Sequence, residues 1–140
     1  MSVIDSVADE VEQVKEVVAR LISEHRQFPL WVRELNDDLG GTEDAEILGR
    51  HFVHLQDALT EHMVTEEFDF YPELARRGLF NETVSAIMQQ HNDLTAALRE
   101  MELALRSKNL EGFKSALDDL ERVLKIHQPA EEEKVFPLVA

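Results

Sequence analysis

Apolar residues recur along this chain at alternating steps of three and four over four separate segments, residues 7–35, 48–66, 84–105 and 110–131. This is the spacing of a helix with one apolar face. The four segments account for nearly all of the chain. The pattern therefore predicts an all-α protein built from four amphipathic helices.

The residues between these segments have the chemistry of helix ends. The Gly-Gly-Thr run at 40–42 can end one helix and cap the next, and Asn109 is a good N-cap before the last segment. The remaining connection opens at Pro72 and closes at Asn81. Short connections make consecutive helices antiparallel, so we expect an up-down-up-down four-helix bundle.

Histidine and glutamate interrupt the apolar face of every segment. The interruptions are His25, His62, Glu66, His91, His127 and Glu131. Burying an unsatisfied polar group costs roughly 2–7 kcal/mol, whereas a whole domain is stable by only about 5–15 kcal/mol. The six residues must therefore pair with one another or bind metal ions. The same interruption in all four segments favours metal ions in the core, which satisfy all six residues at once.

Two of these interruptions are copies of one motif. His62-Met-Val-Thr-Glu66 and His127-Gln-Pro-Ala-Glu131 lie 65 residues apart, and each continues into Glu and then an aromatic-Pro pair. Residues i and i+4 share one helix face, so each copy presents an imidazole and a carboxylate to the same partner. The chain looks like a duplicated two-helix unit.

Facing residues on consecutive antiparallel helices lie equally far from the turn that joins them. The midpoint of the first two histidines of the set falls at residues 43–44, and that of the last two at Asn109. The midpoint of the middle two falls at Arg76 and Arg77, in the connection between the halves. All six residues are therefore predicted to converge at one level of the bundle.

Length and composition narrow the class of protein. A chain of 140 residues is expected to form one domain, residues 1–140. Its net charge of −15 argues against nucleic acid or an anionic membrane as partner. Cysteine is absent, and we find neither a signal-peptide pattern nor a long apolar stretch. These features predict a cytoplasmic protein and indicate no particular protein partner.

The order and spacing of the six residues resemble the hemerythrin-like family, the HHE cation-binding domain, over essentially the whole chain. The resemblance implies a four-helix bundle around a non-haem di-iron centre with a bridging oxo or hydroxo group. It implies that the four histidines take terminal positions on iron and that the two glutamates bridge the ions. The implied metal ligands are His25, His62, Glu66, His91, His127 and Glu131.

One departure from the oxygen-carrying hemerythrins bears on function. Those carriers have His-x-x-x-His on the third helix, but here Thr95 follows His91 at that spacing. The resemblance is closer to six-ligand relatives, which handle or sense iron, oxygen, peroxide or nitric oxide. We therefore expect a protein that binds or reacts with oxygen, hydrogen peroxide or nitric oxide, in oxidative or nitrosative stress or in iron handling.

Two alternatives remain open at this point. The first is a catalase-like or peroxidase-like enzyme acting on hydrogen peroxide, and the second is an acidic scaffold whose site holds zinc or no metal. Imidazole also suits zinc, copper and nickel, so the ligand types do not identify the metal.

Other polar residues near the motifs are expected to play ordinary parts. His51 lies about 16 Å from His62 along a helix, too far to share its metal site, and His54 is interpreted in the same way. Glu67 and Glu132 are turned about 100° from the neighbouring carboxylates and are expected to face solvent.

Four further residues adjoin the motifs. Glu24 and Gln90 each precede a predicted ligand histidine, and helix geometry points them away from it. Tyr71 and Trp31, each unique in the chain, are expected to pack in the core.

Two prolines lie inside helical patterns near ligand histidines. Pro29 removes the hydrogen bond to the carbonyl of His25, and Pro129 follows His127 by two residues. Each proline is expected to kink its helix, and a break after Phe28 is an equal alternative.

Overall fold

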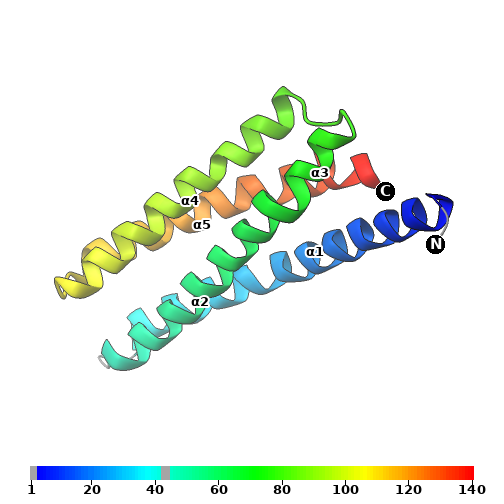
Figure 1. Cartoon of the computed structure of the whole chain (residues 1–140). Helices are drawn as coiled ribbons and strands as arrows, with labels where there is room; N and C mark the ends of the chain where they lie inside the picture. The colour runs from blue at the N-terminus through cyan, green and yellow to red at the C-terminus, as the bar shows by residue number, and fades with distance from the viewer. Residues whose placement is uncertain (1–2, 42–44) are drawn as a thin grey trace.

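The computed structural model describes residues 3–41 and 45–140 of the chain. Four long helices run in up-down-up-down order, so the prediction of an all-α four-helix bundle is confirmed (Figure 1). The long helices are α1 (Val3–Gly41), α2 (Ala45–Thr65), α4 (Glu82–Arg106) and α5 (Leu110–Lys134). A π-helix, η1 (Glu66–Phe70), and a short helix, α3 (Tyr71–Arg76), extend α2, and a 3-10 turn, η2 (Phe136–Val139), follows α5.

Side chains cap the helices of the second half as predicted. The amide oxygen of Asn81 accepts a hydrogen bond from the Val84 N–H at 2.9 Å, and Asn109 accepts one from the Gly112 N–H at 2.9 Å. Helix α1 ends at Gly41, in the predicted Gly-Gly-Thr run. The rest of that turn, residues 42–44, lies outside the described residues, and so do the predicted cap at Thr42 and the first midpoint.

The predicted connection at Pro72 is wrong, because the helical path continues to Arg76. Proline stands in the first turn of α3, where its missing N–H costs no helical hydrogen bond. The turn comes later, at Gly78, whose φ of 72° suits glycine. The Leu79 N–H donates to the Leu74 carbonyl at 2.8 Å across this turn. The residues that follow the first copy of the motif are thus helical up to the turn at Gly78.

Two apolar clusters form the core, with a polar layer between them. The first is built by residues such as Phe52, Leu94 and Leu117 from the half of the bundle nearest the α1–α2 and α4–α5 turns. The second contains Leu21, Phe70 and other residues from the opposite half. The polar layer of the predicted ligands lies between these apolar stretches along each helix.

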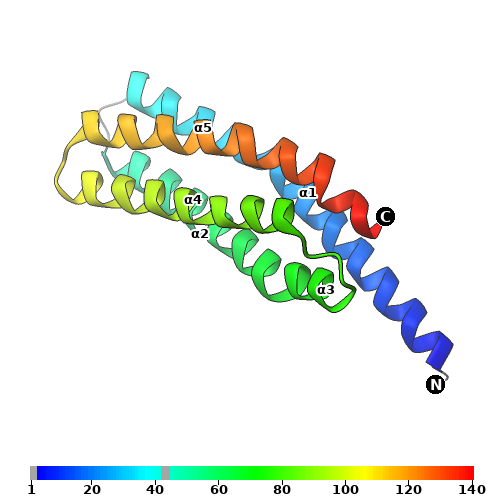
Figure 2. The same cartoon turned by 90° about the horizontal axis from the view of Figure 1, so that it is seen from above.

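Helix α1 is the longest element and projects past the others at its N-terminal end (Figure 2). It continues through Pro29 and α5 continues through Pro129, so neither proline ends a helix. Among the described residues, none of the helices combines the length and the apolar character that crossing a bilayer requires.

Candidate metal centre

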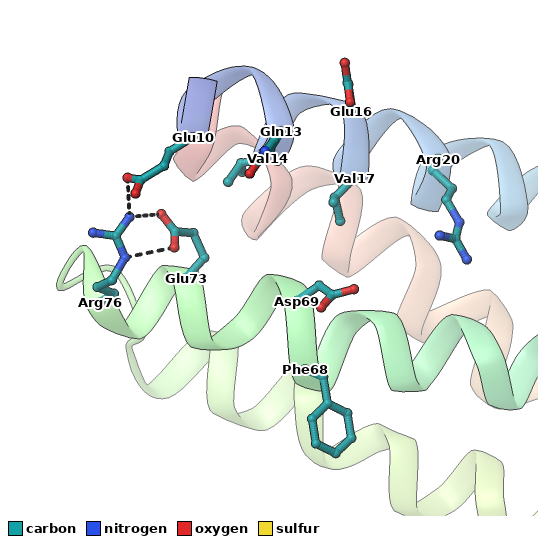
Figure 3. Close-up of a pocket in the computed structure, with 10 residues that line it drawn as sticks. All are labelled: Glu10, Gln13, Val14, Glu16, Val17, Arg20, Phe68, Asp69, Glu73 and Arg76. Atoms are coloured by element: carbon teal, nitrogen blue, oxygen red, sulfur yellow. Dashed lines mark hydrogen bonds and ion pairs between the residues drawn. The ribbon is translucent and has the colours of Figure 1, made fainter. Parts of the chain in front are cut away.

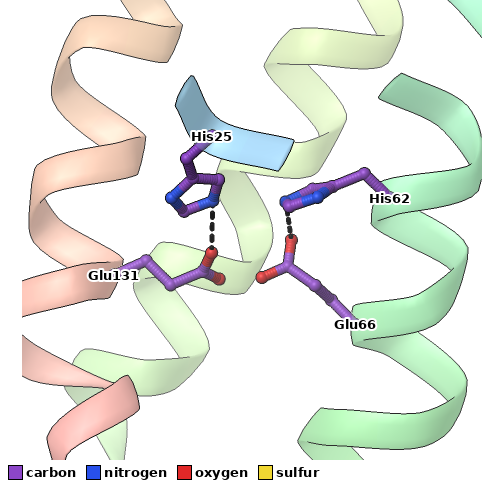
Figure 4. A group of neighbouring side chains, drawn as sticks. All are labelled: His25, His62, Glu66 and Glu131. Carbon is purple, nitrogen blue, oxygen red and sulfur yellow. Dashed lines mark ion pairs between the residues drawn. The ribbon is translucent and has the colours of Figure 1, made fainter. Parts of the chain in front are cut away.

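The six predicted ligands meet in the polar layer, and each is at most 4% exposed. Their donor atoms form two groups of four, and within each group the atoms lie within 4.8 Å of one another. Figure 4 shows the first group, with imidazoles from α1 and α2 facing carboxylates from η1 and α5. The first group is His25, His62, Glu66 and Glu131, and the second is Glu66, His91, His127 and Glu131.

Each carboxylate lies between histidines of different groups. Glu66 Oε1 lies 3.2 Å from His62 Nε2 and 3.1 Å from His91 Nε2. On the opposite side, Glu131 lies 3.1 Å from His25 Nε2 through Oε1 and 3.8 Å from His127 Nε2 through Oε2. Both groups therefore share both carboxylates, an arrangement that suits two neighbouring cations.

Several nitrogen and oxygen atoms of this layer that could bind a metal ion have no hydrogen-bond partner. They are both ring nitrogens of His25, Nε2 of His62, Nε2 of His127 and Glu131 Oε1, all of them buried. The 3.1 Å approach of His25 to Glu131 thus lacks hydrogen-bond geometry. An unsatisfied buried group costs about 1–3 kcal/mol. Metal cations accept such lone pairs, and imidazole nitrogen with carboxylate oxygen is a donor set for first-row metals, so these residues fit a metal pair.

Burial controls the protonation of the layer. It lowers the pKa of His25 to about 3 and that of His127 to about 4, helped by the neighbouring imidazoles. Burial also raises the pKa of Glu131 well above its ordinary value, and the charge of Glu66 adds to the effect. Burial acts on Glu66 in the same direction, but hydrogen bonds from Glu131 and the histidines outweigh it, so its pKa is well below the ordinary value. Without metal, the layer therefore favours a proton on Glu131 and disfavours one on Glu66.

Metal uptake at this site is expected to release protons, because the pKa values of Glu131 and His62 are raised in the metal-free layer. These protons exist only in the metal-free state, so lowering the pH favours that state and weakens metal binding. Calorimetric titration in two buffers with different ionisation enthalpies measures the release. Binding with no proton release and an affinity constant from pH 6 to 8 would contradict this protonation state.

Glu24 and Gln90 have roles that helix geometry alone did not reveal. Each points away from the histidine that follows it, as predicted, but reaches the neighbouring helix. His62 Nδ1 lies 2.8 Å from Glu24 Oε1, and His127 Nδ1 lies 2.8 Å from Gln90 Oε1. Donation from Nδ1–H leaves the Nε2 lone pair free to face the centre. The two residues orient the imidazoles of helices other than their own.

Glu67 and Glu132 stand at the edge of the same layer. Their side chains are 44% and 38% exposed, in agreement with the prediction that they face solvent. The structure adds that Glu67 Oε1 lies 3.4 Å from His91 Nδ1 and that Glu132 Oε1 lies 3.8 Å from His25 Nδ1. Each of the four predicted ligand histidines therefore has a polar side chain beside its Nδ1, the ring nitrogen that faces away from the centre.

Tyr71 is more than the packing residue that its sequence position indicated. It is buried in the second apolar cluster, but its hydroxyl donates to Glu131 Oε2 and lies 3.5 Å from Glu66 Oε2. The π-helix explains the difference, because its wider turn brings residue i+5 back over residue i. In the second copy of the motif Phe136 takes this place and stacks on His25 at 5.7 Å. The sequence did contain one sign of this role, because the first copy of the motif has Tyr where the second copy has Phe.

Gln128 was not singled out from the sequence. Pro29 has no N–H, so the His25 carbonyl lacks its helical donor. The buried side chain of Gln128 supplies a replacement, because its Nε2 donates to that carbonyl at 3.2 Å. This bond ties the backbone at one predicted ligand to α5.

The other two histidines lie apart from the centre, as predicted. His51 Nδ1 is 2.5 Å from an Asp38 carboxylate oxygen on α1. His54 is exposed and its ring packs against Trp31 at 4.5 Å between centroids. Thr95 is also exposed, so it adds no donor to the buried layer.

A surface cleft of about 640 Å³ lies between α1 and the segment from η1 to α3 (Figure 3). Arg76 crosses it and pairs with Glu10 at 3.1 Å and with Glu73. None of the six predicted ligands lines this cleft. The candidate metal ligands are therefore in the buried layer and not in this cleft.

Comparison with known families identifies a matching family over most of the chain. The model of the hemerythrin HHE cation-binding domain matches residues 3–74 and, in a second overlapping match, residues 30–139. No curated protein and no solved structure matches the chain.

Proposed function

The chain belongs to the hemerythrin HHE cation-binding family, and from this premise we propose that it is a non-haem di-iron protein that binds or reacts with oxygen, hydrogen peroxide or nitric oxide. The observation that carries the proposal is the pair of donor groups that share Glu66 and Glu131. Its setting would be the cytoplasm, in oxidative or nitrosative stress or in iron handling.

In this proposal His25 and His62 would hold one iron ion, His91 and His127 would hold the other, and both glutamates would be shared between them. Bound iron would supply redox chemistry toward a small ligand. The apolar clusters on both sides of the layer exclude bulk water. The polar side chains beside Nδ1 of each histidine hold the imidazole rings in position.

The proposal favours a reactive or sensing centre over an oxygen carrier. The exposed Thr95 leaves the centre without the fifth imidazole of the carriers, and no other histidine of the described residues joins the two groups. A peroxide-consuming enzyme is the alternative within the same centre, and it differs in whether the reaction turns over.

Protein made with iron available is expected to contain two iron ions per chain, with oxo-to-iron absorption in the near ultraviolet and no haem band. After reduction, it should oxidise in air without a long-lived oxygen adduct. Metal analysis and stopped-flow absorption spectra test both statements, and repeated additions of peroxide with oxygen detection test turnover.

Zinc alone after iron-replete expression would contradict the di-iron proposal. An adduct that lasts for minutes and releases oxygen under vacuum would show a carrier instead.

A further inference from the structure

The centre has an approximate internal two-fold arrangement that follows from the two copies of the motif. Most members of the layer have a counterpart of the same type in the other copy. The matched pairs are His25 with His91, His62 with His127, Glu66 with Glu131 and Glu67 with Glu132. Two pairs break the pattern, Glu24 with Gln90 and Tyr71 with Phe136. These two exceptions are the differences in residue type, and the matched Glu67 and Glu132 differ only in distance, at 3.4 Å from His91 Nδ1 and 3.8 Å from His25 Nδ1.

The first exception changes the charge behind a ligand histidine. Glu24 places a carboxylate 2.8 Å from His62 Nδ1, whereas Gln90 places a neutral amide oxygen 2.8 Å from His127 Nδ1. A carboxylate that accepts the Nδ1–H makes the imidazole a stronger donor through Nε2. It also adds a carboxylate charge close to the cation, which the exposed Arg20 offsets in part from 3.2 Å on the outer oxygen. The position of His25 and His62 is therefore favoured electrostatically.

The second exception acts on a shared carboxylate. The Tyr71 hydroxyl donates to Glu131 Oε2, the oxygen that faces His127 Nε2. Glu131 Oε1 faces His25 Nε2 and has no hydrogen-bond partner. A hydrogen bond to Oε2 competes with a cation for the same lone pairs, while Phe136 offers no hydroxyl in the other copy. Both exceptions thus weaken the position of His91 and His127.

We propose that the two metal positions are unequal, and that the ion at His25 and His62 is held more tightly than the ion at His91 and His127. The inference rests on the proposed di-metal function. The weaker position fills last and empties first as the free iron concentration falls. Its occupancy would then follow iron availability, while the tighter ion keeps the bundle assembled.

Ferrous iron binding under nitrogen, over a chelator-buffered series of free iron concentrations, tests the inequality. Ions per chain are counted by metal analysis after gel filtration, without any activity measurement. The wild type is expected to fill in two steps separated by about tenfold or more in free iron, the scale of effects from groups behind metal ligands.

Two isosteric substitutions move the steps in opposite directions. Gln90→Glu is expected to tighten the second step by about 10–100-fold and bring it toward the first, whereas Glu24→Gln should weaken the first step by a similar factor. Tyr71→Phe should tighten the second step without changing the net charge. Asp119→Asn is the matched control, because that exposed carboxylate pairs with Arg122 at 3.3 Å on the surface of α5 and should leave both steps unchanged.

The outcomes separate the two proposals. Two ions that bind in a single step would overturn the inequality and leave the di-metal function intact, whereas a protein that takes up no iron would overturn both. The assignment of the weaker position would be overturned if the two binding steps stayed at the same free iron concentrations in Gln90→Glu, Glu24→Gln and Tyr71→Phe. Far-ultraviolet circular dichroism of each variant shows that the helices remain formed.

Discussion

Removal of the metal ions is expected to lower the melting temperature of this protein by roughly 10–20 °C. A ligand that binds only the folded state at a thousand times its dissociation constant adds about 4 kcal/mol. For a domain of this size, each kcal/mol corresponds to a few degrees. Without metal, the buried lone pairs of the polar layer stay unsatisfied. Calorimetry of chelator-treated protein, before and after reloading with iron, measures the change.

The metal-free protein is also expected to lose stability as the pH falls below about 6.5. The unfolded histidines take up protons there, but in the fold the pKa of His25 is lowered to about 3 and that of His127 to about 4. Proton binding therefore favours the unfolded state. The raised pKa values of Glu131 and His62 act in the opposite direction, but the lowered pKa of Glu66 acts with those of His25 and His127, so three groups act against two. A melting temperature unaffected by chelator at any pH would contradict the whole expectation.

Alanine substitution at the predicted ligands is expected to remove bound metal, and Glu131→Ala, like Glu66→Ala, should have the largest effect. Glu131 belongs to both donor groups, so its loss should empty both positions. His62→Ala removes a donor from one group and should lose at least that ion. Metal analysis of purified variants gives the number of ions retained per chain.

His54→Ala provides the matched control for these substitutions. It removes an imidazole from the same helix as His62, but an exposed one that packs on Trp31. The variant should keep its full metal content. If it loses iron as completely as His62→Ala does, the ligand assignment is wrong.

The helices and the level of the polar layer could be predicted from the sequence because both depend on local periodicity. Histidine and glutamate at i and i+4 interrupt a regular apolar pattern, and the spacing from the turns aligns the copies. Asn81 and Asn109 were recognisable for a similar reason, since a cap acts on residues close to it in the chain.

Contacts between helices were not predictable in the same way, because they depend on how each helix is rotated about its axis. Glu24 and Gln90 were correctly placed away from the histidine that follows each of them. The sequence around them does not indicate which side chain of another helix they contact. Tyr71 required knowledge of the π-helix, which shifts the residues after it around the helix axis. A helix of uniform pitch would put that hydroxyl elsewhere.

The bond from Gln128 to the His25 carbonyl makes the residues that are acceptable at two distant positions depend on each other. A proline at position 29 is tolerable beside a ligand because a side chain from α5 replaces the missing backbone donor. If a residue with an N–H took the place of Pro29, the buried amide of Gln128 would compete for an acceptor already in use. If Gln128 were lost first, the carbonyl would be left unpaired. We therefore expect the effect of a substitution at either position to depend on the residue at the other.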